Sequence, residues 1–347
     1  MNLIRPIRKD DLDPLYQMAL DSGVGVTTLP ANKQQMEHKL DRAVKAFAQT
    51  VEQRDSLYLF ALEDIEQGKV AGICAIESQI GNEEVWYNYR LGNTVHASKE
   101  LGVHKQTPTL YLSNDLTGAT ELCTLFLAPD YRKGLNGRLL SKSRYMFLAE
   151  FAERFTQRVI AEMRGYSDDD GRSPFWESLG RLFFSMQFKD ADYLTGLGNK
   201  AFIAELMPKY PIYVPFLTEE AQEVIGAVHE NTKPALAMLE AEGFRKNGYV
   251  DIFDAGPTVE CRLDDIRAVR ESRLLTVAID DAAKEIEDPK GPVYLVSNRQ
   301  FEEYRVGLTP GTNVNEETVV MTAKTAEHMF LKAGDSVRVV SLRPGQN

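Results

Sequence analysis

A short loop rich in glycine and positive charge lies within the stretch LFLAPDYRKGLNGRLL, between a strand-like segment and a helix-like segment. Its chemistry depends on two glycines and three cations: Gly134, Gly137, Arg132, Lys133 and Arg138. The glycines let a ligand approach the backbone, and the first turn of a helix presents unpartnered N–H groups with a partial positive charge. This combination favours a phosphate or pyrophosphate. The alternative interpretation is a tight strand-to-helix turn with solvated charges, because short basic loops are common.

Histidine is the side chain best suited to proton transfer near neutral pH, because its pKa lies close to neutrality. The chain has five histidines: His38, His96, His104, His229 and His328. His229 follows a break between two helical segments and precedes the residues NTKP, which are typical of a helix start. An imidazole at that place caps the helix, packs in the core or transfers a proton. The residues alone leave these interpretations open.

The remaining reactive side chains carry weaker signals. Cys123 lies inside an apolar segment with no histidine beside it in the sequence, so we expect a buried thiol rather than a nucleophile. The histidines are scattered without HxxxH or HExxH spacing, and the cysteines form no CxxC pair. The sequence therefore predicts no metal site.

Length, charge and cysteine content limit the class of protein. The 347 residues predict two or three domains, because one hydrophobic core rarely extends over so long a chain. A net charge of −11 argues against a general nucleic-acid binder. The start, MNLIRPIRKDD, lacks the apolar core of a signal peptide, and no apolar run reaches membrane-spanning length. The odd number of widely separated cysteines indicates free thiols, so we expect a cytoplasmic protein without membrane association.

The elements that would position these residues follow an irregular order in the first half of the chain. Apolar spacing predicts strands over 2–7, 57–62, 69–78, 109–114, 119–128 and 158–164, and helices over 10–20, 33–54, from the basic loop to about 152, and 173–186. Short polar turns between successive strands predict two antiparallel hairpins, the second with Thr117-Gly118 at its turn. The pattern favours a mixed, mostly antiparallel sheet flanked by helices over a regular βαβ repeat.

The second half of the chain changes character twice. Segment 218–244 has a helical pattern with a break near Gly226, and 249–263 is typical of paired strands. Short strands separated by turns follow after about 266, which predicts a small, mostly β C-terminal subdomain. We therefore expect an α/β (α+β) protein in three parts: residues 1–200, a helical and β segment over 201–265, and residues 266–347.

The order of elements around the basic loop resembles the GNAT acyltransferase superfamily. In that superfamily a bulge splays the strand before the loop, and the free backbone groups of the strand pair with the pantetheine arm of coenzyme A. The resemblance implies that Leu125 and Leu127 face the pantetheine and that residues 132–138 cradle the pyrophosphate, within a GNAT-like acyl-CoA-binding domain over 1–200. The glycine spacing of the loop differs by one residue from the superfamily pattern.

Four longer stretches are similar to the bacterial arginine N-succinyltransferase family, in chain order: residues 1–30, 86–103, 109–144 and 226–244. The resemblance implies transfer of the succinyl group of succinyl-CoA to the α-amine of L-arginine, in arginine catabolism, by direct attack on the thioester. Succinyl-CoA is then a co-substrate, and no other cofactor is implied. His229, in the block HENTKPA, takes the place of the family's catalytic proton donor. The segment 201–265 then completes the active site, and the backbone N–H near Leu125 is the candidate oxyanion donor.

Several points stay open beside this resemblance. The same fold could use ornithine as acceptor or another acyl donor, or the chain could be a non-catalytic acyl-CoA-binding or arginine-binding module. A homodimer and a heteromer with a similar subunit are both compatible. For the guanidinium, Asp168-Asp169-Asp170 is a candidate, although a solvated acidic loop is the simpler interpretation. Arg90 and Lys99 are candidates for a substrate carboxylate.

Overall fold

The computed structural model describes the chain except residues 24–26, 83, 169, 198–200 and 346–347. Within the described residues, fifteen strands form one sheet in the order β14-β11-β15-β12-β13-β1-β2-β3-β6-β7-β10-β9-β4-β5-β8. The strands are β1 (Asn2–Pro6), β2 (Leu57–Asp64), β3 (Lys69–Glu77), β4 (Asn88–Ser98), β5 (Val103–Ser113), β6 (Thr120–Leu127), β7 (Arg158–Glu162), β8 (Ile212–Tyr213), β9 (Arg245–Val250), β10 (Pro257–Arg262), β11 (Arg273–Ile279), β12 (Val293–Ser297), β13 (Val306–Pro310), β14 (Thr318–Met321) and β15 (Ser336–Ser341).

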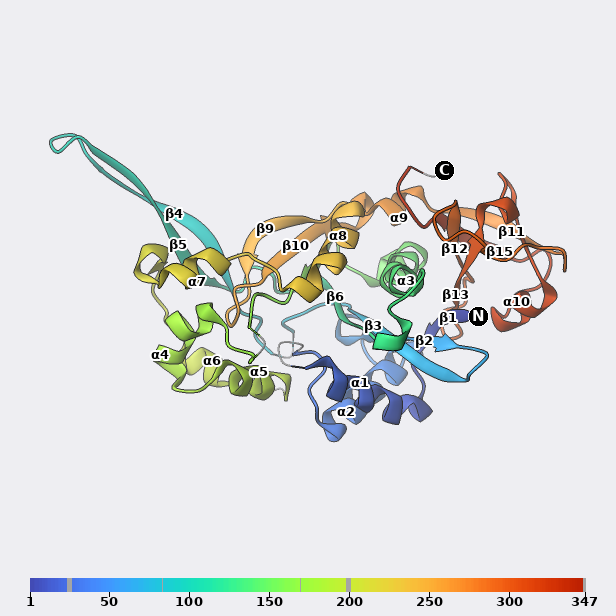
Figure 1. Cartoon of the computed structure of the whole chain (residues 1–347), viewed down its shortest axis with the longest axis horizontal. Coiled ribbons are helices and arrows are strands. Elements are labelled where there is room, and N and C mark those ends of the chain that lie inside the picture. The colour runs from blue at the N-terminus through green and yellow to red at the C-terminus, as the bar shows by residue number, and fades with distance from the viewer. Residues whose placement is uncertain (24–26, 83, 169, 198–200, 346–347) are drawn as a thin grey trace.

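Helices cover both faces of the sheet. They are α1 (Leu12–Ser22), α2 (Lys33–Phe47), α3 (Asn136–Glu150), α4 (Arg181–Phe184), α5 (Phe188–Gly196), α6 (Ala201–Leu206), α7 (Glu219–Val224), α8 (Lys233–Ala241), α9 (Arg267–Glu271) and α10 (Ala323–His328). Alternate residues of β2 point to opposite faces: Tyr58 and Phe60 pack with α3, whereas Leu59 and Ala61 pack with α1 and α2. Figure 1 shows α3 on one side of the central strands and α1 and α2 on the other.

The structure confirms the expected class, a mixed α/β protein with a mostly antiparallel sheet and a β-rich C-terminal part. The hairpin of β2 and β3 forms as predicted. β11 to β15 make up the short strands expected after about 266, and β13 joins them to β1 through Ile4↔Val306. The break in 218–244 is also confirmed, because α7 ends at Val224 and Gly226 adopts φ +73°. The division of the chain at 200 and 265 stays a prediction, and residue 200 lies outside the described residues.

The second predicted hairpin is wrong. β5 pairs with β4 along its whole length, from Asn88↔Ser113 to Ser98↔Val103, while β6 pairs with β3 and β7. The turn at Thr117-Gly118 exists, but the Gly118 N–H donates to the carbonyl of Ile80, and Ile80 N–H donates to Ala119. These bonds direct β6 onto β3. β4 and β5 instead form a long arm that projects from the body (Figure 1).

Two predicted helices are shorter or less regular than expected. The helix over 33–54 ends at Phe47, because Gln49 takes a left-handed conformation with φ 55°. The helix over 173–186 begins at the expected cap, where the Ser173 hydroxyl accepts from the Trp176 N–H. It then contains a π-helical turn at Trp176–Gly180 and ends at Phe184.

α3 is the central helix of the fold and is buried along residues 139–148. Even its charged Lys142 is buried, with Nζ 2.6 Å from Glu242 Oε1. Arg267 Nη2 lies 2.8 Å from the same oxygen, so the buried charges are paired. This network fixes α3 against α8 and α9 and holds the loop at its N-terminus in place.

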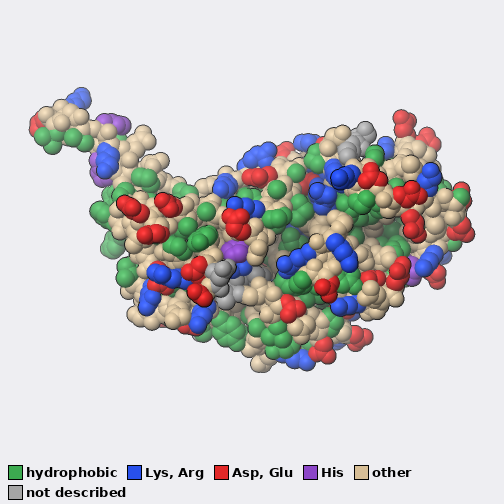
Figure 2. All heavy atoms as spheres, viewed as in Figure 1, with side chains coloured by type: hydrophobic (Ala, Val, Ile, Leu, Met, Phe, Trp, Pro, Cys, Tyr) green, Lys and Arg blue, Asp and Glu red, His purple; other side chains and the backbone are tan. Residues whose placement is uncertain are grey.

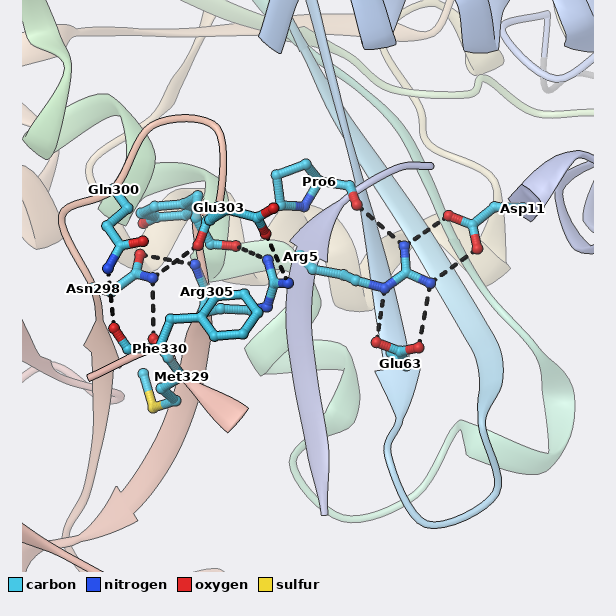
Figure 3. A network of polar contacts seen from close by, with 11 residues as sticks. Arg5, Pro6, Asp11, Glu63, Asn298, Gln300, Glu303, Arg305, Met329 and Phe330 are labelled. Atoms are coloured by element: carbon cyan, nitrogen blue, oxygen red, sulfur yellow. Dashed lines mark hydrogen bonds and ion pairs between the residues drawn. The ribbon is translucent and has the colours of Figure 1, made fainter. Parts of the chain in front are cut away.

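Polar contacts also hold β1 to its neighbours and order the C-terminal part. Arg5 of β1 binds Asp11 and Glu63, with Nη1 2.7 Å from Asp11 Oδ2 and Nε 2.7 Å from Glu63 Oε2 (Figure 3). Nearby, the Asn298 amide donates to the carbonyls of Glu303 and Met329 and accepts from the Arg305 N–H (Figure 3). No helix among the described residues is long and apolar enough to cross a membrane.

Candidate active site

β6 and β7 form a wedge that opens toward their carboxyl ends. The two parallel strands pair only at Thr120↔Val159 and Glu121↔Ile160. Beyond Glu121 the register of β6 on β3 shifts between Ile73 and Ala75, which is the signature of a bulge. Thr124, in the bulge, has φ 53°, a strained value for a β-branched residue. The bulge bends β6 away from β7.

Backbone groups of β6 line this wedge. The N–H of Ala128 donates to Ala71 on the β3 side, and successive backbone groups of a strand alternate in direction. The N–H and C=O groups of Leu127 and Leu125 therefore point to the β7 side, where pairing has already ended. Arg132 confirms this direction for Leu127, because its Nε donates to the Leu127 carbonyl at 2.9 Å.

The basic loop lies at the end of β6, as expected. Gly134 has φ +59°, which favours glycine, and α3 begins at Asn136 without a side-chain cap at Leu135. The side chains of Arg132, Lys133 and Arg138 are exposed. Among the described residues no carboxylate lies within 4.0 Å of any of these three cations, so the end of α3 carries uncompensated positive charge next to its unpartnered N–H groups.

His229 lies inside the wedge. Its backbone N–H donates to the carbonyl of Arg164 at 3.0 Å, and the preceding residue, Val228, forms an isolated antiparallel β-bridge with Gly165. The N–H of Met163 donates to Pro257 on the β10 side, so the Arg164 carbonyl points the other way, toward β6. The segment that carries His229 is therefore attached to the end of β7 on the side that faces the splayed β6.

The imidazole of His229 is held by the turn that follows it. Nδ1 accepts from the N–H of Asn231 at 3.2 Å, and the ring is half-buried. Because Nδ1 accepts this bond, the neutral ring carries its proton on Nε2. The predicted cap and the predicted proton donor are thus compatible: one nitrogen caps the turn and the other is the protonated one.

The other histidines lie elsewhere. His38 and His104 are exposed, and His96 lies on the arm with its ring 5.8 Å from that of Tyr213. His328 ends α10 in the C-terminal part. Cys123 lies near the bulge, but burial raises the pKa of its thiol to about 12, which supports an unreactive thiol.

The described candidates for substrate charges have other contacts or lie on the arm. Asp168 accepts from the N–H groups of Asp170 and Arg172, which is a local loop contact, and Asp169 lies outside the described residues. The Arg90 guanidinium lies over the ring of Tyr111, and Lys99 is exposed near the tip of the arm.

Sequence reasoning missed a group of polar residues at the carboxyl end of β7: Asn88, Glu162, Asp251, Asp254 and Thr258. The one available signal was a glutamate at the end of the apolar segment RVIAE, where a charge is unexpected. Their partners come from strands far apart in the chain, so the sequence could not bring them together.

The surface agrees with this arrangement. Figure 2 shows a hollow near the centre of one face, with Lys and Arg side chains gathered on the side toward α3. A separate open depression of about 580 Å³ lies at the opposite end of β7 and includes Arg158 and Glu260. Those two side chains pair with each other at 2.7 Å, so much of the charge there is already satisfied.

Comparison with known proteins gives a consistent result. Family models described as arginine N-succinyltransferase beta subunit, and the C-terminal domain of that subunit, match residues 2–268 and 273–341. The chain is 54% identical over 340 residues to the beta subunit of arginine N-succinyltransferase from Pseudomonas aeruginosa, with 98% of each chain covered. It is 53% identical over 346 residues to arginine N-succinyltransferase from Yersinia pseudotuberculosis, covering 99% of this chain and 98% of that one.

A solved structure is also similar over its full length. This is subunit AI of arginine/ornithine succinyltransferase from Pseudomonas aeruginosa, which superposes with a TM-score of 0.90 at 35% sequence identity, with 99% of both chains covered.

Proposed function

Since the chain belongs to the arginine N-succinyltransferase family, we propose that it transfers the succinyl group of succinyl-CoA to the α-amine of L-arginine. The products are N2-succinyl-L-arginine and free CoA. The family makes the chain an acyltransferase of arginine catabolism, and the proposal adds the donor, the attacked atom and the residues that act. The observation that carries it is the position of His229 in the wedge, beside the β7 end and across from the backbone groups of Leu125 and Leu127.

The thioester lies along β6 in this proposal. The N–H of Leu127 and the C=O of Leu125 pair with the pantetheine arm, and the N–H of Leu125 stabilises the carbonyl oxygen as it gains negative charge. The diphosphate binds at residues 132–138, where the N-terminus of α3 and the cations Arg132, Lys133 and Arg138 supply donors and charge. Gly134 and Gly137 leave the backbone accessible.

The reaction itself needs a neutral amine and a proton for the departing thiolate. The amine nitrogen attacks the thioester carbon, the new C–N bond forms, and the C–S bond breaks with its electron pair on sulfur. Water accepts the proton that the amine releases, and His229 donates its Nε2 proton to the departing thiolate, after which the ring regains a proton from solvent. Holding both substrates in the wedge contributes further, because attack becomes intramolecular in effect.

Ornithine is a second candidate acceptor, because the similar solved structure is named arginine/ornithine succinyltransferase. A purely non-catalytic binding module is less well supported, since a sensor does not need an imidazole in the thioester wedge. We also propose that the chain works as an assembly with a second copy or a similar subunit, as the word subunit in the relatives' names suggests.

Mass spectrometry of the products tests the proposal directly. Purified protein is mixed with succinyl-CoA and L-arginine, and parallel reactions replace arginine by ornithine or succinyl-CoA by acetyl-CoA. We expect N2-succinyl-arginine as the main product and little product from acetyl-CoA. Binding of succinyl-CoA without product from either amine would instead support the non-catalytic module.

A further inference from the structure

Polar side chains from three strands meet at the carboxyl end of β7. Glu162 is the last residue of this strand, and Asn88 is the first residue of β4. The Asn88 amide donates from Nδ2 to Glu162 Oε1 at 2.5 Å. Tyr89 pairs with Val250, so the next residues along, Asn88 and Asp251, lie opposite each other.

Two fully buried polar atoms beside Glu162 have no hydrogen-bond partner within the part of the chain that the structure describes. Asn88 is 0% exposed. Its Nδ2 donates a hydrogen bond to Glu162, whereas its Oδ1 has no partner among the described residues. Thr258 is also 0% exposed and lies directly opposite Glu162 in the β7–β10 register, and its Oγ1 is unpartnered. Buried polar atoms without partners are rare in folded proteins, and a bound group that supplies the missing donors explains them.

Among the described residues no Lys or Arg nitrogen lies within 4.0 Å of Glu162 or Asp251. Arg164 is the cation at this end of β7, but its guanidinium donates to the Ser167 hydroxyl at 3.1 Å and interacts with Asp254 rather than with Glu162. Burial, followed by the charge of Asp251, raises the pKa of Glu162 well above its ordinary value. One carboxylate oxygen of Asp251 accepts hydrogen bonds from the N–H groups of Phe253 and Asp254. The cluster therefore has more carboxyl groups than cations, and a bound cation would favour the ionised form of Glu162.

The backbone separation between Glu162 and the carbonyl that binds His229 can be compared with the length of an arginine side chain. Glu162 is two residues before Arg164, whose carbonyl binds the His229 N–H, and two strand residues span about 7 Å. An extended arginine side chain has a similar length between its α-amine and its guanidinium. Glu162 and Asp251 are half-buried rather than fully covered, so a ligand can reach them.

We propose that Glu162 and Asp251 bind the guanidinium of the acceptor, with Asn88 Oδ1 and Thr258 Oγ1 as further acceptors. The inference rests on the proposed function and assigns its acceptor pocket. A guanidinium is planar, permanently charged and has five N–H donors, which matches two carboxylates and two neutral oxygens. A shorter ammonium chain with three donors satisfies fewer of them, so the pocket favours arginine over ornithine.

Steady-state kinetics of Glu162→Gln tests this assignment, with Glu260→Gln as the matched control. Glu260 is also a half-exposed strand carboxylate, but it is paired with Arg158. We expect the KM for L-arginine to rise about 10- to 100-fold in Glu162→Gln, while kcat at saturating arginine and the KM for succinyl-CoA stay within about 3-fold. Asp251→Asn is expected to behave in the same way, and the control variant like the unaltered protein.

L-Citrulline provides a readout that a structural role would not move, because its ureido group has the shape of a guanidinium without the charge. The ratio of kcat/KM for arginine to that for citrulline is expected to fall at least about 10-fold in Glu162→Gln. Calorimetric binding of succinyl-CoA shows whether the variant is folded. If unaltered protein forms no succinyl-arginine, the proposed function fails. If it does and Glu162→Gln keeps both the arginine KM and the arginine-to-citrulline ratio, the pocket assignment fails.

Discussion

In the proposed mechanism, His229 combines two tasks in one side chain. Its Nδ1 accepts the Asn231 N–H and so caps the turn that leads into α8, which leaves the proton of the neutral ring on Nε2. The backbone bond to Arg164 fixes the ring against the end of β7. From the sequence alone, this cap can be interpreted as purely structural. In the proposed mechanism it also determines which nitrogen of the ring can donate a proton to the thiolate.

Replacing His229 by alanine removes the proton carrier and leaves the thioester-binding strand intact. We expect kcat for arginine-dependent CoA release to fall about 100-fold or more, in line with the loss of general acid–base catalysis. Succinyl-CoA affinity, measured by calorimetry, is expected to stay within about 3-fold. His38→Ala, which changes an exposed histidine, serves as the control. Turnover near normal in His229→Ala contradicts the proton role.

Glu162 gives a prediction for stability as well as for binding. Burial first, and then the charges of Asp251, Glu121 and Asp254, raise its pKa in the folded protein above the unfolded value of about 4.3. Its contribution to stability is therefore fully present below that unfolded pKa and is lost as the pH rises through the folded pKa. Glu162→Gln does not titrate and escapes this loss.

Urea unfolding between pH 4.5 and 8 measures the effect. We expect the free energy of unfolding of Glu162→Gln, relative to the unaltered protein, to increase with pH over this range. Glu260→Gln is expected to show no such trend. A difference that stays constant with pH would mean that Glu162 is ionised in the folded protein without penalty. A carboxylate that lowers stability at neutral pH is typical of a binding site.

At the scale of elements, the wedge depends on a strand, a loop and a helix acting together. The bulge at Thr124 turns the β6 backbone outward, and the loop then leads into the uncapped N-terminus of α3. α3 can present this terminus in a fixed position because Lys142, Glu242 and Arg267 anchor it from within. The strained residue thus lies where the strand must leave the sheet.

The cations at the start of α3 are expected to act on the donor alone. Changing Lys133 and Arg138 together to glutamine removes two exposed positive charges that have no ion-pair partner among the described residues, and we expect the fold of the helix to be kept. We expect the KM for succinyl-CoA to rise about 10- to 100-fold, with a weaker dependence on salt, and the KM for arginine to change little. Arg262→Gln, an exposed arginine at the other end of β7, is the control. An unchanged succinyl-CoA KM would place the diphosphate elsewhere.

At the scale of the whole molecule, the sheet runs without interruption from the C-terminal strands through β1 to the wedge. β1 is the link, because it pairs with β13 on one side and with β2 on the other. Arg5 holds this link with two carboxylates, Asp11 and Glu63, from the helix and strand beside it. We therefore expect the strand that links the C-terminal strands to the wedge to depend on this buried ionic contact.

Replacing Arg5 by alanine leaves the buried carboxylate of Asp11 without its partner. We expect the free energy of unfolding to fall by about 3–5 kcal/mol, measured by urea denaturation. Lys33→Ala breaks the exposed pair with Asp13, and we expect a much smaller change in the free energy of unfolding, because solvent screens exposed pairs. Equal losses in the two variants would show that the Arg5 contact does not hold the strand in place.

The sequence by itself determined the features that depend only on residues close together in the chain. Period-two apolar patterns located the hairpin of β2 and β3 and the strands of the C-terminal part, since each pattern spans a few consecutive residues. The glycine-rich loop, the start of the helix after it and the break before His229 were equally local. The resemblance to known sequences then supplied the chemistry that these patterns alone left open.

The tertiary structure decided which segments meet. The long β4–β5 arm was missed and β5 was paired with the wrong strand, because the bonds of Gly118 and Ile80 that direct β6 onto β3 join distant segments. Glu162 and Asn88 lie 74 residues apart and touch only after β4, β7, β9 and β10 have assembled. Strand pairing depends on long-range register, which local propensity does not encode, so the wedge and the acidic cluster beside His229 emerge only in the folded chain.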